Sequence, residues 1–157
     1  MGDRTPAPFE TRDPDFEARV RDSFARQRMM RTLGAELAAV RPGEVEIALP
    51  FRDDLTQQHG YVHAAAVTAV ADSACGYAAL TLMAPGREVL SVEFKVNLVA
   101  PASEGRFVAR GRVLRPGRTL TVCAAEVHAE GGASRTLVAV LQATMISVAA
   151  PDSATDP

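Results

Sequence analysis

The sequence lacks the features that mark disulfide-bonded, membrane-spanning or nucleic-acid-binding proteins. It has only two cysteines, Cys75 and Cys123, both inside apolar runs without CxxC spacing, so we expect buried thiols rather than disulfides or thiol catalysis. A formal charge of −2 favours neither nucleic acid nor an anionic membrane as a partner. No apolar run approaches the roughly 18 residues of a membrane span, and the N-terminus has no apolar signal core. These absences predict a cytoplasmic protein with no nucleic-acid and no membrane partner.

The length of 157 residues fits one domain with a sizeable core. Residues 1–13 are rich in proline and charge and residues 148–157 are small and polar, so both segments are predicted to be flexible tails. Residues 14–147 then form a single domain. There is no strand-helix-strand alternation and no GxGxxG motif, which argues against a doubly wound nucleotide-binding fold.

The first half of the domain predicts a helix followed by a hairpin. Asp13-Pro14-Asp15 is a helix start, and a helical apolar stripe follows it at Phe16, Val20, Phe24, Met30 and Leu33. Its arginines alternate with acidic residues, so we interpret the opposite face as solvated. Residues 35–40 and 45–49 alternate as strands around the turn Arg41-Pro42-Gly43.

The second half predicts one buried helix and four strands. Residues 62–82 are apolar on every side and contain eight alanines, so a sheet can wrap closely around this helix until Pro85-Gly86 ends it. The strands are expected at residues 89–98, 107–114, 119–129 and 134–147, as an antiparallel meander whose last strand is central. The predicted class is α+β, with one helix inside a curved sheet.

The residues that could take part in catalysis lie in and just before the buried helix. Gly60 permits a tight turn, and a helix beginning just after it leaves backbone N–H groups free to hold an oxyanion. Asp72 follows His63 by nine residues and is the single charge inside the apolar helix. Neighbouring hydroxyls such as Ser73 or Thr68 could satisfy a structural carboxylate there, but we favour a functional role for Asp72.

These residues resemble the motifs of the PaaI-like acyl-CoA thioesterases of the hotdog-fold superfamily, over roughly residues 35–147. The matching elements are Gln57, Gly60-Tyr61-Val62-His63-Ala64-Ala65, Asp72, the strand from Ser91 to Pro101, and the turn Gly117-Arg118-Thr119. The resemblance implies a hotdog fold, which is a long central helix wrapped by a curved antiparallel sheet of about six strands, here with an extra N-terminal helix. The chain departs from the family at Ala64 and Ala65, where the family has two glycines.

The resemblance also implies roles. Asp72 would be the general base or the nucleophile, the Ala64 N–H would polarise the carbonyl, Gln57 would orient water or substrate, and His63 would hold the loop or assist polarisation. A base role works best if burial raises the pKa of Asp72, whereas a nucleophile does not need this. Ser91 is a further candidate, although strand alternation points it away from the helix unless a bulge intervenes. Alanine at position 64 would be strained only if its φ were positive, and a residue at the start of a helix does not have a positive φ.

The implied substrate is an aromatic or medium-chain acyl-CoA, hydrolysed to the free acid and CoA without any cofactor. Arg115 and Arg118 are candidates for binding the CoA phosphates, although solvated strand arginines are an equal reading. We do not favour a metal site at His59 and His63, because Gly60 interrupts a helix through both and no other His or Cys lies nearby.

The family joins its sheets edge to edge, which implies a homodimer or a dimer of dimers. Asp72 of one subunit would then face Gln57, His63 and Ala64 of another. Two other functions remain open. The first is a non-catalytic hotdog module that binds acyl-CoA or an acyl ligand. In such a module the free-energy cost of placing the Asp72 carboxylate in the cavity would have no explanation. The second is a hotdog dehydratase or hydratase, which usually pairs a histidine with an acid in a different motif.

Overall fold

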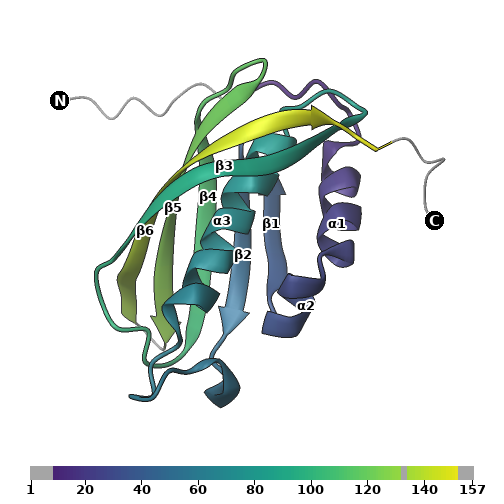
Figure 1. The fold of residues 1–157 in the computed structure, drawn as a ribbon. Coiled ribbons are helices and arrows are strands. Elements are labelled where there is room, and N and C mark those ends of the chain that lie inside the picture. The colour runs from purple at the N-terminus through teal and green to yellow at the C-terminus, as the bar shows by residue number, and fades with distance from the viewer. Residues whose placement is uncertain (1–8, 132–133, 152–157) are drawn as a thin grey trace.

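One six-stranded sheet curves around one long helix (Figure 1). The computed structural model describes residues 9–131 and 134–151. In chain order the elements are α1 (Phe16–Arg26), α2 (Arg28–Leu33), β1 (Glu36–Arg41), β2 (Glu44–Pro50), a 3₁₀ turn (Asp53–Leu55), α3 (Ala64–Leu80), β3 (Arg87–Leu98), β4 (Arg106–Arg115), β5 (Leu120–Gly131) and β6 (Ser134–Ala149). The predicted α+β architecture, with its central helix and extra N-terminal helical segment, is confirmed.

The strand order is β1-β2-β4-β5-β6-β3, and every neighbouring pair is antiparallel. The predicted four-stranded meander is therefore wrong in one respect, because β3 pairs with β6 and not with β4. Alternation along the chain identifies each strand but does not name its neighbour. β6 is an interior strand, as its apolar residues predicted, and β3 forms one edge of the sheet.

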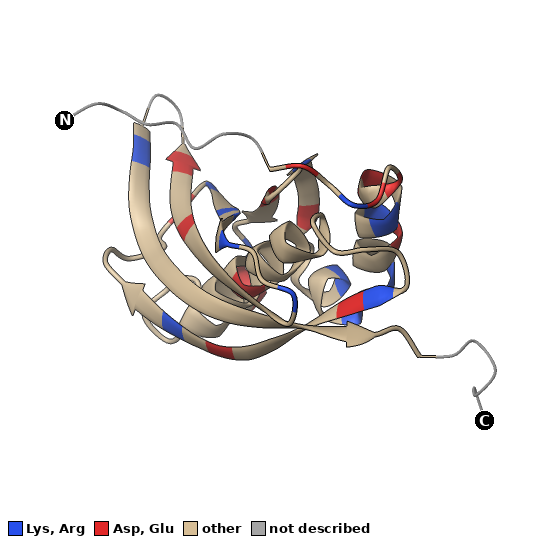
Figure 2. Cartoon of the chain, turned by 90° about the horizontal axis from the view of Figure 1, so that it is seen from above, with Lys and Arg blue, Asp and Glu red and all other residues tan. Residues whose placement is uncertain are grey.

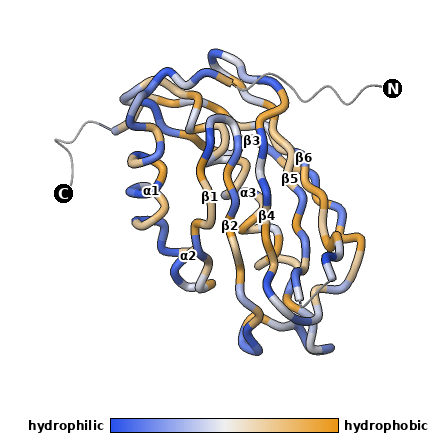
Figure 3. The backbone as a smooth tube through the Cα atoms, turned by 180° about the vertical axis from the view of Figure 1, so that it is seen from behind, coloured by the Kyte–Doolittle hydropathy of each residue, from blue (hydrophilic) through white to orange (hydrophobic). Residues whose placement is uncertain are grey.

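The small residues of α3 let the sheet approach it closely. Ala71, Ala74 and Ala78 are fully buried, and the tube in Figure 3 shows hydrophobic residues alternating with polar ones along the strands around them. Gly111 on β4 lies against the helix backbone, where an added Cβ would overlap the carbonyl carbon of Ala74. The largest fully buried side chains include Phe107, Ile47, Leu49, Leu141 and Met145.

Arg19 on α1 fixes the C-terminal end of α3. Its guanidinium lies 3.1 Å from the buried carboxylate of Asp13. It also donates hydrogen bonds of 2.8–3.0 Å to the carbonyl oxygens of Leu80, Met83 and Ala84. A cation at this position satisfies carbonyl groups that have no partner within the helix and offsets the negative end of its dipole.

The predicted tails are shorter than expected. Phe9 packs over Gly43, and the Thr11 hydroxyl donates to the Thr81 carbonyl oxygen at 2.8 Å, so residues 9–13 belong to the folded body. At the other end β6 continues to Ala149. Residues 1–8 and 152–157 of the predicted tails lie outside the described residues. The segment 1–13 is rich in proline and charge, but it also contains Phe9 and Thr11, which contact the domain. Composition alone therefore misplaced the start of the domain.

Charged residues of both signs lie side by side along α1 in Figure 2. The exposed pair Arg21 and Glu17 is one example, at 2.7 Å, and it agrees with the predicted solvated face. Among the helices of residues 9–131 and 134–151, none is long and apolar enough to cross a membrane.

Candidate active site

The N-terminus of α3 is a helix start of ordinary geometry. His63 is its N-cap, with φ −60° and ψ 139°, and the His63 Nδ1 accepts a 2.9 Å hydrogen bond from the Ala65 N–H. Every described residue with positive φ is a glycine, so neither alanine is strained where the family has glycine. The Ala64 N–H donates to none of the described residues. It is thus a free donor at the positive end of a helix.

A tight turn leads into this helix and positions Gln57. Gly60 adopts φ +82°, and its N–H donates to the Gln57 carbonyl oxygen at 3.0 Å. The Gln57 side-chain Oε1 accepts from the His59 N–H, and the Gln57 N–H donates to the Tyr61 carbonyl oxygen at 2.8 Å. The turn therefore holds the Gln57 amide through its oxygen. A left-handed conformation at position 60 explains the glycine there.

Asp72 contacts Ser91 through a strand irregularity. The register of β3 against β6 shifts between Ser91 and Glu93, so the Ser91 hydroxyl turns toward α3 and donates to Asp72 Oδ1 at 2.8 Å. Simple alternation would have pointed this hydroxyl away from the helix. Burial raises the pKa of the Asp72 carboxyl above its ordinary value, and the Ser91 hydrogen bond lowers it in part.

Asp72 borders an open pocket of about 320 Å³ between α1, α3 and β3. The apolar part of its lining comes from Val89, Leu90 and Met145. Polar atoms are supplied by Ser23 and Tyr77, whose hydroxyls lie 3.5 Å apart, and by Arg26, Gln27, Ser73, Glu88 and Ser91. α1, which the sequence predicts as a short amphipathic helix, contributes Ser23 and Arg26 to this pocket.

A second open pocket, of about 560 Å³, lies at the N-terminus of α3. Gln57, His63 and Ala64 line it, together with Leu98 and Val99 at the end of β3. Asp72 lies eight residues after Ala64 on α3, a distance of about 12 Å along the helix axis. One chain thus brings Asp72 to Ser91, and Gln57 to His63 and Ala64, but it does not unite the two groups.

The two pockets lie at opposite ends of the same exposed strand. β3 has no hydrogen-bonded neighbour on its outer edge among the described residues. That edge carries large apolar side chains, with Leu90 58%, Phe94 45% and Leu98 54% exposed. A long apolar edge strand of this kind is a surface for pairing with another chain.

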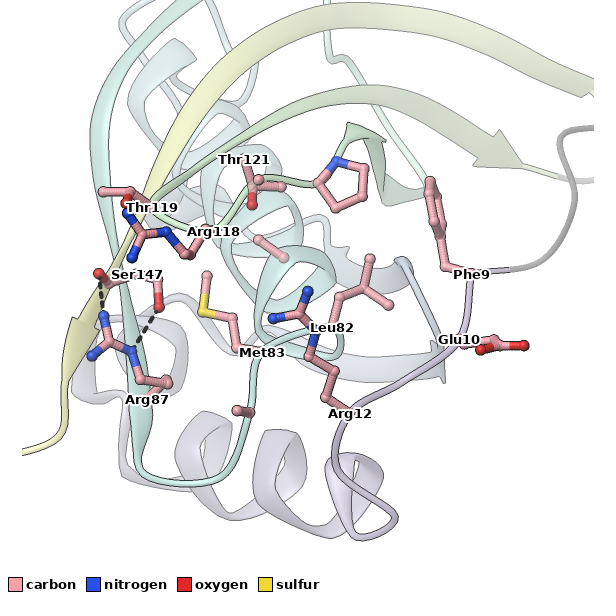
Figure 4. Close-up of a pocket in the computed structure, with 14 residues that line it drawn as sticks. Phe9, Glu10, Arg12, Leu82, Met83, Arg87, Arg118, Thr119, Thr121 and Ser147 are labelled. Atoms are coloured by element: carbon pink, nitrogen blue, oxygen red, sulfur yellow. Dashed lines mark hydrogen bonds between the residues drawn. The ribbon is translucent and has the colours of Figure 1, made fainter.

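The two arginines predicted to bind phosphate differ in their surroundings. Arg118 lines a third pocket, at the C-terminal end of α3, but Arg115 does not. Arg12 and Arg87 line the same pocket as Arg118 (Figure 4), and neither was predicted from the sequence to bind a ligand. Arg12 lies in a segment predicted to be a tail, and Arg87 lies just after the turn that ends α3. Among the described residues no three His, Cys, Asp or Glu side chains cluster as metal ligands would.

Comparison with known proteins identifies the class. The family model of the Thioesterase superfamily matches residues 59–135. A thioesterase family protein from Silicibacter pomeroyi is 48% identical, with 85% of this chain and 98% of that one covered and a TM-score of 0.83. The PaaI protein of E. coli, from its phenylacetic acid degradation operon, shares the fold at 14% identity and a TM-score of 0.78, over 89% of this chain and 98% of that one.

A curated relative from Saccharolobus solfataricus, SSO2140, is provisionally named an esterase. It is 27% identical over 94 residues, which are 60% of this chain and 66%, just under two thirds, of that protein. The wrapped helix and antiparallel sheet, together with these matches, define a hotdog-fold protein. The chain belongs to the thioesterase superfamily, a class of thioester hydrolases.

Proposed function

We propose that the protein is an acyl-CoA thioesterase that hydrolyses an aromatic or medium-chain acyl-CoA to the free acid and CoA. The observation that carries the proposal is Asp72, a partly buried carboxylate that borders a pocket and has a raised pKa. Burying a carboxylate in an apolar helix is costly, and a catalytic base repays this cost with a pKa closer to the working pH.

The active site is assembled from two copies of the chain. Leu90, in the Asp72 pocket, and Leu98, in the Ala64 pocket, lie four residues before and after Phe94. If two β3 strands pair antiparallel about a two-fold axis near Phe94, Leu90 of one copy lies beside Leu98 of the other. This pairing covers the exposed apolar edge and places Asp72 of one copy opposite Ala64 of its partner. The proposed assembly is a homodimer or a dimer of dimers.

Hydrolysis then follows from the two halves of the site. Asp72 accepts a proton from a water molecule as the water oxygen bonds to the thioester carbon. The carbonyl oxygen becomes an oxyanion and accepts a hydrogen bond from the Ala64 N–H at the positive end of α3. The C–S bond breaks as the carbonyl reforms, and the CoA thiolate takes the proton that Asp72 holds. Gln57 orients the water or the substrate, and His63 holds the helix start.

Two features of Asp72 favour the base over the nucleophile. Burial raises the pKa of its carboxyl group. A higher pKa makes the carboxylate a stronger proton acceptor, which a general base requires and a nucleophile does not. Ser91 occupies Oδ1, which leaves Oδ2 without a hydrogen-bond partner among the described residues and available to a water molecule. A nucleophilic Asp72 would instead form a mixed anhydride with the acyl group, and water that attacks the Asp72 carbonyl carbon of this anhydride would leave ¹⁸O in Asp72 after a single turnover in ¹⁸O-labelled water.

The pocket beside Asp72 supports an acyl group of moderate size. Its volume of about 320 Å³ lies at the small end of ligand pockets. Gly76 faces it from α3, where an added Cβ would come 3.9 Å from Val89 Cγ1. The hydroxyls of Tyr77 and Ser23 give the same pocket polar atoms, so both aromatic and straight-chain groups belong in a substrate panel.

The first experiment measures free thiol released from aromatic and straight-chain acyl-CoAs by the wild type, Asp72→Ala and the control Asp22→Ala. We expect one acyl class to be hydrolysed and its turnover to fall by about a hundredfold or more in Asp72→Ala alone. Binding of acyl-CoA without hydrolysis of any panel member would contradict the proposal and favour the non-catalytic binding module.

The composite site is tested by mixing two inactive variants. Ala64→Pro removes the Ala64 N–H at a helix position where proline is tolerated, and the preceding residue already has the extended backbone that proline requires. Asp72→Ala and Ala64→Pro copies, unfolded and refolded together, should regain activity because mixed dimers contain one intact site. Activity that stays absent in the mixture, although mixed dimers form, would place the whole site within one chain.

A further inference from the structure

The pocket beside Asp72 has two chemically different walls. The strands β3 and β6 supply its apolar side chains, which are Val89, Leu90 and Met145. The helices α1 and α3, with the residue that follows α1, supply a second wall. The polar groups of this second wall are the hydroxyls of Ser23, Ser73 and Tyr77 and the amide of Gln27. The hydrolysis proposed above uses none of these four groups.

The polar wall is built from matched spacings on two neighbouring elements. Ser23 and Gln27 are four residues apart at the end of α1, and Ser73 and Tyr77 are four residues apart on α3. Residues at this spacing lie on one face of a helix. Gln27 Nε2 donates to Ser73 Oγ at 3.3 Å, and the hydroxyl oxygens of Ser23 and Tyr77 lie 3.5 Å apart. The two pairs therefore form a row of polar groups along one side of the pocket.

These contacts leave hydrogen-bonding capacity unused. Both distances are long for hydrogen bonds of their type. Gln27 Oε1 is buried and has no hydrogen-bond partner among the described residues, and the Gln27 side chain does not cap α2, although Gln27 is the N-cap residue of that helix. Burial raises the pKa of the Tyr77 hydroxyl, so its O–H stays protonated and can donate. An unpaired buried amide atom is costly, and rotation of the side chain can bring it to a ligand in the pocket that Gln27 lines.

Other contacts hold the polar wall in place. Arg19 ties α1 to the carbonyl oxygens of Leu80 and Met83 at the end of α3. The ring of Phe24 on α1 packs edge-on against the ring of Tyr77, with 5.9 Å between their centroids. Polar groups fixed in this way discriminate between ligands. An apolar acyl group expels water from the wall and leaves its polar groups unpaired, whereas a polar substituent replaces the lost hydrogen bonds.

We propose that Gln27 and Tyr77 are specificity-determining residues that hydrogen-bond an uncharged polar group, such as a hydroxyl, on the acyl chain of the substrate. A hydroxyl both donates and accepts, so it satisfies the Gln27 amide whether its oxygen or its nitrogen faces the ligand. The inference rests on the proposed thioesterase function and narrows its acyl group to one that is polar on the side facing α1. Gln27 precedes residues 59–135, which match the family model, so one selecting residue lies in the N-terminal helical segment.

Binding of matched ligands tests the proposal without hydrolysis. In an Asp72→Ala background, calorimetry compares hexanoyl-CoA with ω-hydroxyhexanoyl-CoA, and benzoyl-CoA with hydroxybenzoyl-CoA. We expect the hydroxylated ligand of at least one pair to bind about tenfold more tightly, and Gln27→Met to abolish that difference, because one buried polar group left unpaired has an effect of this size. The matched control is Gln142→Met, since Gln142 is exposed on β6 and lines none of the three pockets described above. Equal affinities within both pairs would overturn the proposal.

Kinetics and stability separate this role from the proposed function and from a structural role. Gln27→Met should lower kcat/KM for the preferred hydroxylated substrate by about tenfold and leave kcat/KM for its unsubstituted partner unchanged. Tyr77→Phe keeps the ring against Phe24, loses only the hydroxyl, and should shift the preference in the same direction.

The melting temperature of Gln27→Met should change little, because the variant loses one long hydrogen bond together with one unpaired oxygen. A lower melting temperature with an unchanged preference would make Gln27 a structural link between α1 and α3 and overturn the proposal. A hydroxyl preference in binding without hydrolysis of any thioester would contradict the thioesterase function and leave Gln27 and Tyr77 as the selecting residues of a binding site.

Discussion

The two ends of α3 differ in how far the rest of the chain satisfies their backbone hydrogen-bonding groups. At the C-terminal end, Arg19 and Thr11 donate to four carbonyl groups at or beyond the last turn. At the N-terminal end, His63 satisfies the Ala65 N–H, but the Ala64 N–H remains free among the described residues. The comparison teaches that one end is fixed by the protein itself, whereas the other keeps a donor for a ligand. Stability and chemistry are therefore expected to respond to different substitutions.

The largest expected effect is at the N-terminal end. Ala64→Pro removes one N–H and should lower kcat by about 10²–10³-fold, the loss that follows removal of an oxyanion-hole donor. The melting temperature should change little because proline is compatible with the first helical position. The control is Ala64→Ser, which keeps the N–H and should keep most activity. A Ser variant as inactive as the Pro variant would show that the side chain at position 64, and not its N–H, matters.

At the C-terminal end the effect should fall on stability. Arg19→Met removes the hydrogen bonds to the carbonyl groups and leaves Asp13 buried without its cation, which should cost about 3 kcal/mol of unfolding free energy. Arg21→Met is the control, because its exposed ion pair with Glu17 contributes about 0.5 kcal/mol or less. Urea unfolding of the two variants measures both values. Similar losses in the two variants would mean that Arg19 does not anchor the helix.

The cap of the N-terminal end should have an intermediate effect. His63→Ala leaves the Ala65 N–H without its acceptor and should cost about 1 kcal/mol of unfolding free energy. His63→Asn offers another good cap and should recover most of that loss. The same urea unfolding assay compares the two. If both variants are equally unstable, the imidazole contributes through packing and not through the cap.

The smallest expected effect is a shift in pH dependence. A base must be deprotonated, so kcat/KM should rise with pH through the pKa of Asp72, which burial raises above the ordinary value. The Ser91 hydrogen bond opposes this rise, so Ser91→Ala should raise the pKa further and move the acid limb of the profile to higher pH. Ser91→Thr keeps the hydroxyl and should leave the limb near its original position. A limb that does not move in Ser91→Ala would show that another group controls it.

Local patterns in the sequence predicted most of the fold and part of the site. Period-two alternation identified the strands, and the apolar run around Asp72 identified the central helix, because burial on one or all sides dictates side-chain polarity. The spacing from Gly60 through His63 to Asp72 located the helix start and its acid. The structure places these residues as that spacing requires, and their catalytic roles remain predictions.

Features that depend on contacts between distant segments were not predictable. The pairing of β3 with β6 joins Ser91 to Met145 across more than fifty residues, and no local pattern encodes it. The bulge that turns Ser91 toward Asp72 depends on the same pairing. Arg12 and Arg87 meet Arg118 only because the N-terminal segment folds back over the end of α3. The sequence does not distinguish an arginine that is exposed to solvent from one that lines a pocket with other arginines.

Gly111 sets how near the sheet comes to the helix. It has no unusual φ, so its need for glycine comes from the lack of space between its Cα and the backbone at Ala74. Asp72 lies two residues before Ala74 on the same helix, so a larger residue at position 111 would displace the acid without touching the active site. In a library carrying all amino acids at every position, selection for activity should retain glycine alone at 111. Such a result would look like the signature of a catalytic residue, although its origin is purely steric.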